Sequence, residues 1–393
     1  MEIQQYSDWS SAVHGVSVSK RIPVSGTIEV TERCNNRCAH CYVNLPLKDQ
    51  KARSNELTYE EHCRILDEIS AAGCLWVCFT GGEIFIRKDF LDIYTYAKRK
   101  GLLVTLFTNG TMITPQIADY LVKWRPFSIE ITLYGNTKET YEKVSGIPGS
   151  YQRCMEGIHL LMARGLPLRL KTTVVTLNKH EVGDMRRFAE EALEMDFKFD
   201  AIINPRCDCS RSPLDVRIAP AEVVALDLQE PKRVEAWRKL NAEVGNAYNE
   251  NGNRDLLWSC GGGQSSFAVD PYGKLQVCVI SKNETYDLRN GSFQEGWQHF
   301  LYNIKQKKTT LQTKCTSCGL RIMCNICPAN AQLECMDAES PVDFLCQVTH
   351  LRAHAFGIAI PPHGDCEYCE GGSRYQEILQ TVKNLKKGLS AED

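Results

Sequence analysis

The segment Cys34-Asn-Asn-Arg-Cys38-Ala-His-Cys41 places three thiols within eight residues, directly after the apolar run Gly26-Thr-Ile-Glu-Val30. Three thiolates this close together can wrap one metal centre. Four cysteines would saturate a [4Fe–4S] cluster, whereas three leave one iron open to another ligand. Catalytic zinc sites keep a coordination position free in the same way. The segment therefore predicts a reactive metal centre at the end of a strand.

Apolar, strand-like runs alternate with amphipathic helical stretches from residue 24 onward. The expected strands are 26–31, 75–80, 102–108, 127–133, 168–176 and 199–204. The expected helices are 58–72, 88–100, 115–123, 150–164 and 179–194. Strand and helix units in series predict a parallel sheet with right-handed crossovers. Parallel-barrel enzymes assemble their active sites at the carboxyl ends of the strands, and each glycine-punctuated motif here follows a strand.

Three further motifs follow in order along the chain. They are Thr80-Gly-Gly-Glu83, Thr108-Asn-Gly-Thr111 and the strand Ser128-Ile-Glu-Ile-Thr-Leu-Tyr134. Together with the cysteine segment, this order resembles the radical S-adenosylmethionine (SAM) superfamily over about residues 24–205. The resemblance implies a partial (β/α)6 barrel in which Cys34, Cys38 and Cys41 hold a [4Fe–4S] cluster whose open iron binds SAM. It also implies reductive cleavage of SAM to a 5′-deoxyadenosyl radical that abstracts hydrogen from a substrate.

The resemblance also assigns cofactor-binding residues. His40 is expected near the SAM adenine rather than on iron. Gly81, Gly82 and Glu83 are expected at the methionine end of SAM, where a carboxylate suits the amino group, although Ile84 stands where the family often has proline. Polar residues in apolar strands are costly unless paired, and ribose hydroxyls would satisfy them. The residues in question are Asn109, Glu130, Thr132 and Lys171. The alternative is ordinary turn and strand-face residues.

A second cysteine-rich region runs from Cys260 to Cys369 and has few long periodic elements. Its densest part is the run Cys315-x2-Cys318-x5-Cys324-x2-Cys327. A four-cysteine run at this spacing has a chance expectation of about 0.002 per chain, so we expect it to bind metal. Because paired Cys-x2-Cys elements often bind Zn²⁺, a zinc ribbon is the alternative to iron–sulfur clusters.

Taken together with the N-terminal motifs, this region resembles the SPASM extension of peptide-modifying radical SAM enzymes, which carries auxiliary [4Fe–4S] clusters. The resemblance implies one cluster on Cys315, Cys318, Cys324 and Cys346, and another on Cys260, Cys278 and Cys327. The family run ends in Cys-x3-Cys, and here the last gap is two residues. The fourth ligand of the latter cluster is open among Cys335, Cys366, Cys369, a carboxylate, solvent and substrate. Cys366-Glu-Tyr-Cys369 is itself a Cys-x2-Cys pair.

The expected organisation has five parts. They are a polar lead-in (1–23), the barrel (24–205), a bridging region (206–257), the auxiliary-cluster domain (258–370) and a C-terminal helix or tail (371–393). Within the bridge we expect helices at 219–225 and 231–249. Cys207 and Cys209 lie on the loop after the sixth strand. One of them could donate hydrogen to a substrate radical, and simple packing or contact with a cluster is the alternative.

The composition indicates the cellular compartment and the classes of binding partner. The 393-residue chain has 19 cysteines and a net charge of −2, so there is no basic excess that would favour nucleic acid as a partner. No stretch approaches the ~18–20 uncharged apolar residues of a membrane span, and the first residues lack the apolar core of a signal peptide. We expect a cytoplasmic, oxygen-sensitive protein whose cysteines bind metal clusters.

The resemblance implies an oxidoreductase or maturase that modifies a ribosomally synthesised peptide or a protein side chain. The implied partners are that substrate, a low-potential electron donor such as flavodoxin or ferredoxin, and a separate small leader-peptide-binding protein, since residues 1–23 are too few for such a domain. Two enzyme alternatives stay open, an anaerobic sulfatase-maturing (formylglycine-generating) enzyme and a tetrapyrrole-tailoring enzyme. A zinc-stabilised binding protein without catalysis is the alternative from another class.

Overall fold

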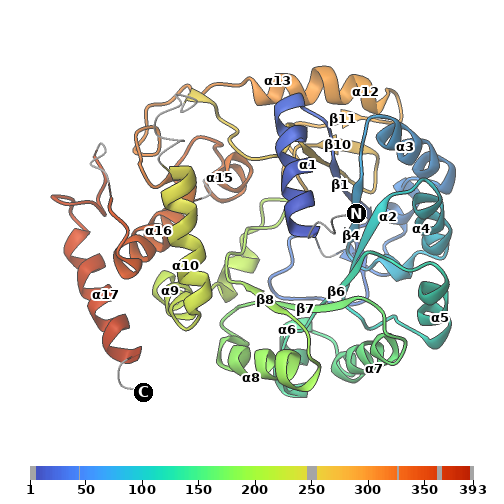
Figure 1. Ribbon diagram of the computed structural model, residues 1–393, viewed down its shortest axis with the longest axis horizontal. Helices are drawn as coiled ribbons and strands as arrows, with labels where there is room; N and C mark the ends of the chain where they lie inside the picture. The colour runs from blue at the N-terminus through green and yellow to red at the C-terminus, as the bar shows by residue number, and fades with distance from the viewer. Residues whose placement is uncertain (1–5, 44, 246–254, 325–326, 361–364, 390–393) are drawn as a thin grey trace. The chain divides into compact units, whose positions relative to one another are not determined.

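The computed structural model describes residues 6–43, 45–245, 255–324, 327–360 and 365–389 (Figure 1). The chain divides into two compact units. The barrel unit comprises Met1–Val216 and Cys260–Lys305, and the C-terminal unit comprises Arg217–Ser259 and Gln306–Asp393. The expected domain 258–370 is therefore split, because a strand at Ser266–Val269 joins the sheet of the barrel unit. Among the described residues, no helix is both long and apolar enough to span a membrane.

A nine-stranded sheet in the order β11-β10-β9-β1-β4-β5-β6-β7-β8 forms the centre of the barrel unit. Its strands are β1 (Ser25–Thr31), β4 (Trp76–Gly81), β5 (Leu103–Thr108), β6 (Ser128–Thr132), β7 (Leu168–Thr173), β8 (Phe197–Asp200), β9 (Ser266–Val269), β10 (Lys274–Gln276) and β11 (Tyr286–Asp287). Strands β1 and β4 to β8 pair in parallel in chain order, which confirms the predicted six-stranded parallel core. The last strand, expected at 199–204, begins at Phe197 and ends at Asp200.

The sheet extends beyond the predicted strands. Strand β9 pairs in parallel with β1, and β10 and β11 follow as antiparallel neighbours. These three strands have four, three and two residues, which is too short for an alternating pattern to show in the sequence. A separate two-stranded sheet pairs β2 (Arg33–Cys34) with β3 (Leu45–Pro46).

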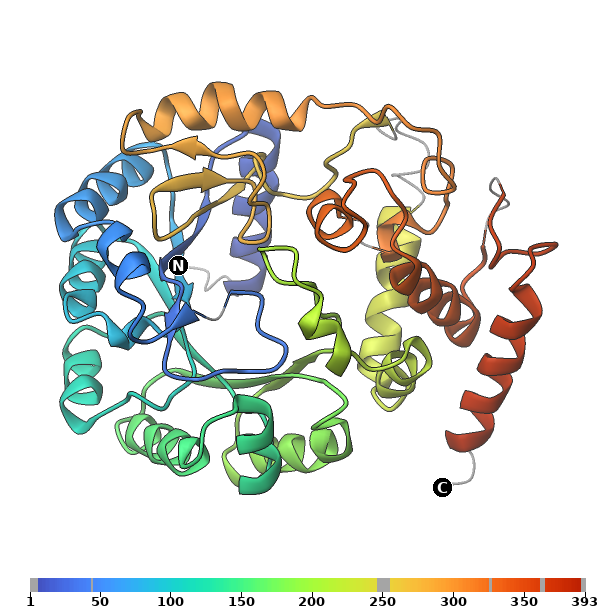
Figure 2. The same ribbon diagram turned by 180° about the vertical axis from the view of Figure 1, so that it is seen from behind.

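Helices α3, α4, α5, α7 and α8 lie along the outer side of the curved sheet (Figures 1 and 2). The helical segments of this unit are α1 (Tyr6–Lys20), α2 (Gln50–Asn55), α3 (Tyr59–Ala71), η1 (Ile84–Ile86), α4 (Phe90–Arg99), α5 (Pro115–Lys123), α6 (Lys138–Ser145), α7 (Ser150–Met162), η2 (Lys179–Glu181), α8 (Val182–Arg187), η3 (Phe188–Ala192), η4 (Ser212–Val216), α12 (Phe293–Glu295), η7 (Gly296–Leu301) and α13 (Tyr302–Lys305). Helix α3 begins at a capping box in which the Thr58 and Glu61 side chains each accept from the other's backbone N–H.

The strands bury alternate residues against these helices and turn the others inward. Val77 and Phe79 of β4, like Val104 and Leu106 of β5, are almost completely buried. Their neighbours in the sequence, such as Phe107, line a cavity inside the barrel. Because side chains alternate across a strand, each strand supplies both the hydrophobic core and the wall of the cavity.

The expected polar lead-in contains a helix that belongs to the barrel unit. Helix α1 packs its Tyr6 and Trp9 against Trp76, and Tyr6 also contacts Phe127. Trp76 begins β4 and Phe127 precedes β6, so α1 covers the amino ends of the strands. The end of the barrel opposite the cysteine segment is thereby closed.

The C-terminal unit is helical around one buried helix. Its helices are α9 (Pro220–Leu228), α10 (Pro231–Leu240), η5 (Asn241–Gly245), α14 (Arg321–Cys324), α15 (Pro328–Cys335), α16 (Asp343–Phe356) and α17 (Tyr375–Leu389). Nearly every residue of α16 is buried. The two helices expected in the bridging region correspond to α9 and to α10 with η5, and residues 246–249 of the latter expectation lie outside the described residues.

Buried Asp227 of α9 joins two arginines inside the C-terminal unit. Its carboxylate accepts from Arg233, and from Arg352 of α16 at 2.7 Å. Asp227 is completely buried and the Arg352 side chain nearly so. The Asp227 and Arg352 charges are therefore shielded from water, and each depends on the other.

We expect Asp227→Ala to lower the free energy of unfolding by about 3–5 kcal/mol, since it leaves a buried guanidinium unpaired. Anaerobic urea denaturation followed by circular dichroism measures this change. Glu235→Ala, at an exposed position of α10, is the control and should change stability little. Equal stability of the two variants would contradict the buried ion-pair network.

Candidate active site

Cys34, Cys38 and Cys41 lie on β2 and on the loop that follows the carboxyl end of β1. The backbone N–H of Arg37 donates to the Ser145 carbonyl at 2.8 Å, and that of Ala39 to the Val144 carbonyl at 3.1 Å. These bonds attach the loop to the end of α6, a helix that the sequence analysis did not predict. The backbone of the loop is thus attached to α6.

Burial raises the pKa of two of these three thiols. It raises the pKa of Cys34 to about 12, with the neighbouring Glu83 carboxylate adding to the effect. It also holds the pKa of Cys38 well above its ordinary value. Thiolates are the metal-binding form, so the loop needs a bound cation to keep them deprotonated. Three such thiols at one wall of a cavity fit a cluster with one open position.

The cavity at the carboxyl ends of the strands has a volume of about 540 Å³, within the range usual for small-ligand sites. All three cysteines of the loop line it. It is also lined by most of the predicted cofactor-binding residues, namely His40, Gly81, Gly82, Asn109, Thr132 and Lys171. The structure therefore brings the cysteine loop and the ends of β4, β5, β6 and β7 to one space.

Gly81 and Gly82 serve the backbone packing beside this cavity. Gly81 has a φ of +125°, and a Cβ there would lie 2.1 Å from the Thr31 carbonyl oxygen. A Cβ on Gly82 would lie 2.0 Å from the Arg33 carbonyl oxygen. Both glycines are required because the chain after β4 passes directly against the chain after β1.

Glu83 is completely buried and is not among the residues that line the cavity. Its carboxylate accepts from the Thr108 hydroxyl at 2.7 Å and from the backbone N–H of Asn109 and Phe85 at 2.8 and 3.2 Å. Burial raises the pKa of Glu83, and these donors counteract that rise. In this arrangement Glu83 fixes the Asn109 turn, and its expected contact with SAM stays a prediction.

Glu130 and Lys171 form an ion pair across β6 and β7. The Lys171 ammonium lies 3.0 Å from the Glu130 carboxylate and over the Phe107 ring. Lys171 lines the cavity, whereas Glu130 does not. Burial lowers the pKa of Lys171, while the charge of Glu130 opposes that change. Lys171 thus presents a positive charge to the cavity, and the Glu130 carboxylate, which is not part of the cavity lining, pairs with that charge.

Sequence reasoning missed Asn35 and Asn36, the two asparagines between Cys34 and Cys38. The Asn35 side chain donates to Thr111 at 2.7 Å and accepts from Asn109 at 2.9 Å, which links the cysteine loop to the β5 turn. The amide of Asn36 and the Nδ1 atom of His40 are buried without a hydrogen-bond partner in the structure. Both residues line the cavity, so a bound polar ligand would satisfy them. The two successive asparagines inside the motif were the available signal.

A buried charge cluster lies behind the cysteine loop. Glu29 of β1 is completely buried, accepting from Lys282 at 2.8 Å and from the Tyr42 hydroxyl at 3.1 Å. Lys282 also lies 3.7 Å from Glu32. Tyr42 directly follows the cysteine motif, whereas Glu29, Glu32 and Lys282 belong to no motif. Lys282 comes from the segment after β10, so only the fold assembles the cluster.

Cys207 lies beside this cluster. Its N–H donates to the Tyr42 carbonyl at 2.9 Å, and its Sγ lies 3.8 Å from the Val279 carbonyl oxygen. Tyr42 and Val279 both line the cavity. Cys209, two residues on, has a φ of +65° and is partly exposed.

Cys278 also lines the main cavity, and Cys260 is exposed in the same unit, where its carbonyl accepts from Lys305. Cys327 belongs to the C-terminal unit, where it precedes α15 as the N-cap residue. The grouping of Cys260, Cys278 and Cys327 on one cluster stays a prediction.

Cys315, Cys318, Cys324 and Cys346, the complete predicted auxiliary set, line one small cavity in the C-terminal unit. Lys314 and Arg321 line the same cavity, and their cations suit a cluster of thiolates. Cys346 comes from buried α16 and Cys324 from α14. This tertiary arrangement gathers residues that span more than thirty positions of sequence.

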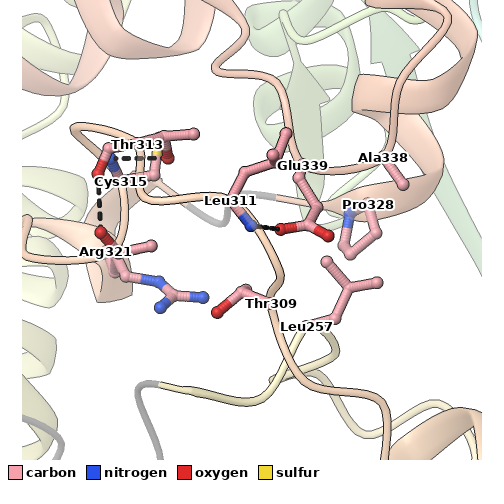
Figure 3. Close-up of a pocket in the computed structure, with 10 residues that line it drawn as sticks. Leu257, Thr309, Leu311, Thr313, Cys315, Arg321, Pro328, Ala338 and Glu339 are labelled. Carbon is pink, nitrogen blue, oxygen red and sulfur yellow. Dashed lines mark hydrogen bonds between the residues drawn. The ribbon is translucent and has the colours of Figure 1, made fainter.

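Figure 3 shows the loop that carries Cys315, seen at a neighbouring apolar recess. The Glu339 carboxylate accepts from the backbone N–H of Thr310 and Leu311 at 2.7 and 2.8 Å. These bonds lower the pKa of Glu339. The Cys315 N–H in turn donates to the Thr313 hydroxyl at 3.3 Å. Hydrogen bonds to its backbone therefore hold the loop in place.

Comparison with known proteins agrees with this geometry. Residues 28–192 match the model of the radical SAM superfamily. This segment belongs to that superfamily. The predicted radical SAM membership, enzyme class and barrel fold are confirmed, and an iron–sulfur cluster and SAM are the cofactors of such a domain. A non-catalytic zinc-stabilised protein is not supported.

Several relatives are similar over most of the chain. An AdoMet-dependent heme synthase of Methanosarcina barkeri is 24% identical, over 77% of this chain and 90% of the relative. Mycofactocin maturase MftC of Mycolicibacterium smegmatis is 26% identical, over 76% of each chain. Among solved structures, Streptococcus suis SuiB bound to S-adenosylmethionine matches with a TM-score of 0.60 at 15% identity, covering 88% of this chain and 82% of SuiB. This last likeness concerns the fold.

We expect Glu83→Gln to lower the free energy of unfolding by about 1–3 kcal/mol, because an amide N–H₂ would face buried donors. Thermal unfolding of the anaerobic protein measures the change, and exposed Glu156→Gln is the control. Unchanged stability combined with loss of SAM binding would instead place the carboxylate on SAM.

Proposed function

We propose that this chain is a radical SAM maturase that modifies a ribosomally synthesised peptide or a protein side chain. The observation that carries the proposal is the cavity of about 540 Å³, which is lined by the three loop cysteines and also by Cys278. A predicted auxiliary ligand thus shares a wall with the predicted radical-generating site. The similarity to a PqqA peptide cyclase of Ruegeria pomeroyi, 30% identical over 44% of this chain, supports a peptide as substrate.

The residues of the cavity fit the implied cofactors. Cys34, Cys38 and Cys41 would hold the [4Fe–4S] cluster, and the unsatisfied polar atoms of Asn36 and His40 would face SAM. When bound, these cofactors supply a 5′-deoxyadenosyl radical that removes hydrogen from the substrate. The chain's own contribution is to orient and bury the reacting groups, with Lys171 presenting a positive charge to the ligand.

The proposal includes two auxiliary [4Fe–4S] clusters. One would be held by Cys315, Cys318, Cys324 and Cys346, and the other by Cys260, Cys278 and Cys327. Further parts of the proposal are a low-potential electron donor such as flavodoxin or ferredoxin and a separate small leader-peptide-binding protein.

A tetrapyrrole-tailoring activity is the second candidate. Two AdoMet-dependent heme synthases cover 77% of this chain and 86–90% of their own length at 24–25% identity. Comparing 5′-deoxyadenosine formation in the presence of an iron porphyrin and of a short cysteine-containing peptide would distinguish the two substrate classes. The sulfatase-maturing alternative is supported by likeness of fold alone.

Anaerobic reconstitution tests the cluster count. We expect about twelve iron atoms per chain, four for each of three clusters, and formation of 5′-deoxyadenosine with dithionite. The triple variant Cys34→Ala, Cys38→Ala, Cys41→Ala should lose about four of these irons and all SAM cleavage. SAM cleavage in the triple variant would refute the cluster assignment, and about four irons in the wild type would refute the auxiliary clusters.

Cys207 is proposed as a hydrogen-atom donor to the substrate radical. Donation breaks the S–H bond and leaves a thiyl radical, which one electron from the low-potential donor and one proton would return to the thiol. Burial raises the pKa of Cys207 to about 12, so the thiol keeps its proton at neutral pH. Cys207→Ala should retain SAM cleavage but lose at least 10-fold of the solvent deuterium incorporated into product in D₂O. Cys209→Ala is the matched control and should retain it. Equal deuterium incorporation by both variants would show that Cys207 only packs in the fold and donates no hydrogen.

A further inference from the structure

A histidine and two cysteines converge in the C-terminal unit. His350 lies on α16, and Cys366 and Cys369 lie on the segment before α17. Their ligand atoms all lie within 4.8 Å of one another. In the described part of the chain, this is the one group of three or more His, Cys, Asp or Glu side chains gathered so tightly. We propose that these three residues bind a single zinc ion, separate from the iron–sulfur clusters.

The orientation of His350 suits a metal ligand. Its Nδ1 atom lies 2.7 Å from the Cys346 carbonyl oxygen. A carbonyl can only accept, so Nδ1 carries the proton and the neutral ring has its lone pair on Nε2. Metal-binding histidines are commonly fixed in this way by a backbone carbonyl. The lone pair of His350 is therefore directed by α16 itself.

The distances fit one tetrahedral ion. The Nε2 atom of His350 lies 3.5 Å from Cys366 Sγ and 3.4 Å from Cys369 Sγ. A tetrahedral Zn²⁺ with ordinary Zn–S and Zn–N bonds separates its sulfur and nitrogen ligands by about 3.6 Å. The three atoms need to move only slightly to bind. A fourth ligand would complete the tetrahedral coordination of the zinc ion.

The segment that carries the two cysteines is built to hold them close together. The Cys369 N–H donates to the Cys366 carbonyl at 3.2 Å, and the Gly372 N–H to the Cys369 carbonyl at 2.8 Å. A Cβ on Gly372 would lie 2.3 Å from the Cys366 carbonyl oxygen, so this turn requires glycine. The Tyr368 hydroxyl donates to Asp343 in the first turn of α16, which ties the turn to the helix of His350.

Compactness separates this trio from a cluster site. The thiolates of a [4Fe–4S] cluster bind different irons and so stand further apart than ligands of one ion. The cysteines 315, 318, 324 and 346 do not form such a tight group, although His350 and Cys366 line the same small cavity. Cys346 offers its thiol to that cavity and its carbonyl to His350. The two predicted centres would thus be neighbours on α16.

Metal analysis of the full-length chain, reconstituted anaerobically with iron, sulfide and one equivalent of Zn²⁺, tests the proposal. Plasma mass spectrometry should find about one zinc per chain, and zinc X-ray absorption should show two sulfurs at about 2.3 Å and a nitrogen near about 2.0 Å. His350→Gln and the double variant Cys366→Ser, Cys369→Ser should lose at least 10-fold in zinc affinity while keeping their iron. His354→Gln, one turn further along α16, is the control and should keep its zinc.

Three results would overturn the proposal. They are wild-type protein without zinc, zinc bound by sulfur alone, and variants that lose iron and retain zinc. If the variants fail to fold, the sulfur and nitrogen count of the wild-type spectrum still decides. None of these readouts depends on SAM cleavage or on a peptide substrate, so the zinc site and the proposed function succeed or fail separately.

Discussion

The parallel alignment of β1 with β4 is the constraint on which the active site depends. Beyond the last paired residues, the N–H of Gly82 donates to the Thr31 carbonyl at 2.7 Å and that of Glu83 to the Arg33 carbonyl at 3.0 Å. Side chains at positions 81 and 82 would prevent this approach. The cysteine loop after β1 is thereby held against the turn after β4.

Glu83 links the turn after β4 to the turn after β5. Its buried carboxylate satisfies donors of the Thr108-Asn109 turn, and Asn109 in turn contacts Asn35 of the cysteine loop. A buried carboxylate is tolerated only when its hydrogen bonds are made. Three motifs separated by up to 75 positions therefore form one hydrogen-bonded unit around the predicted metal ligands.

The two units use cysteine differently. In the barrel unit, the strands and helices form a large hydrophobic core, and the predicted metal ligands lie on a loop at its edge. In the C-terminal unit, the cysteines at 315, 318, 324 and 346 and the trio around His350 lie on or beside α16. Metal binding and folding are thermodynamically coupled in such sites, so we expect this unit to lose more stability than the barrel unit when metal is removed.

Much of the protein could be predicted from local sequence. The six parallel strands were predictable because each has apolar residues of the right length followed by a polar or glycine turn. The cysteine motifs were predictable because metal ligands on one loop have short, fixed spacings. Helix α1 was not predicted, because its residues are mostly polar and its packing on Trp76 and Phe127 is visible only in the folded chain.

The sequence by itself determined the barrel, the ligand types and the end of the sheet at which they lie, since these follow from local pattern and strand direction. Tertiary structure alone decided that Glu83 bonds to the Asn109 turn, that Lys282 neutralises Glu29, and that His350 meets Cys366 and Cys369. These contacts join residues whose separation along the chain has no periodicity. Their physical cause is the packing of whole strands and helices, which no local pattern encodes.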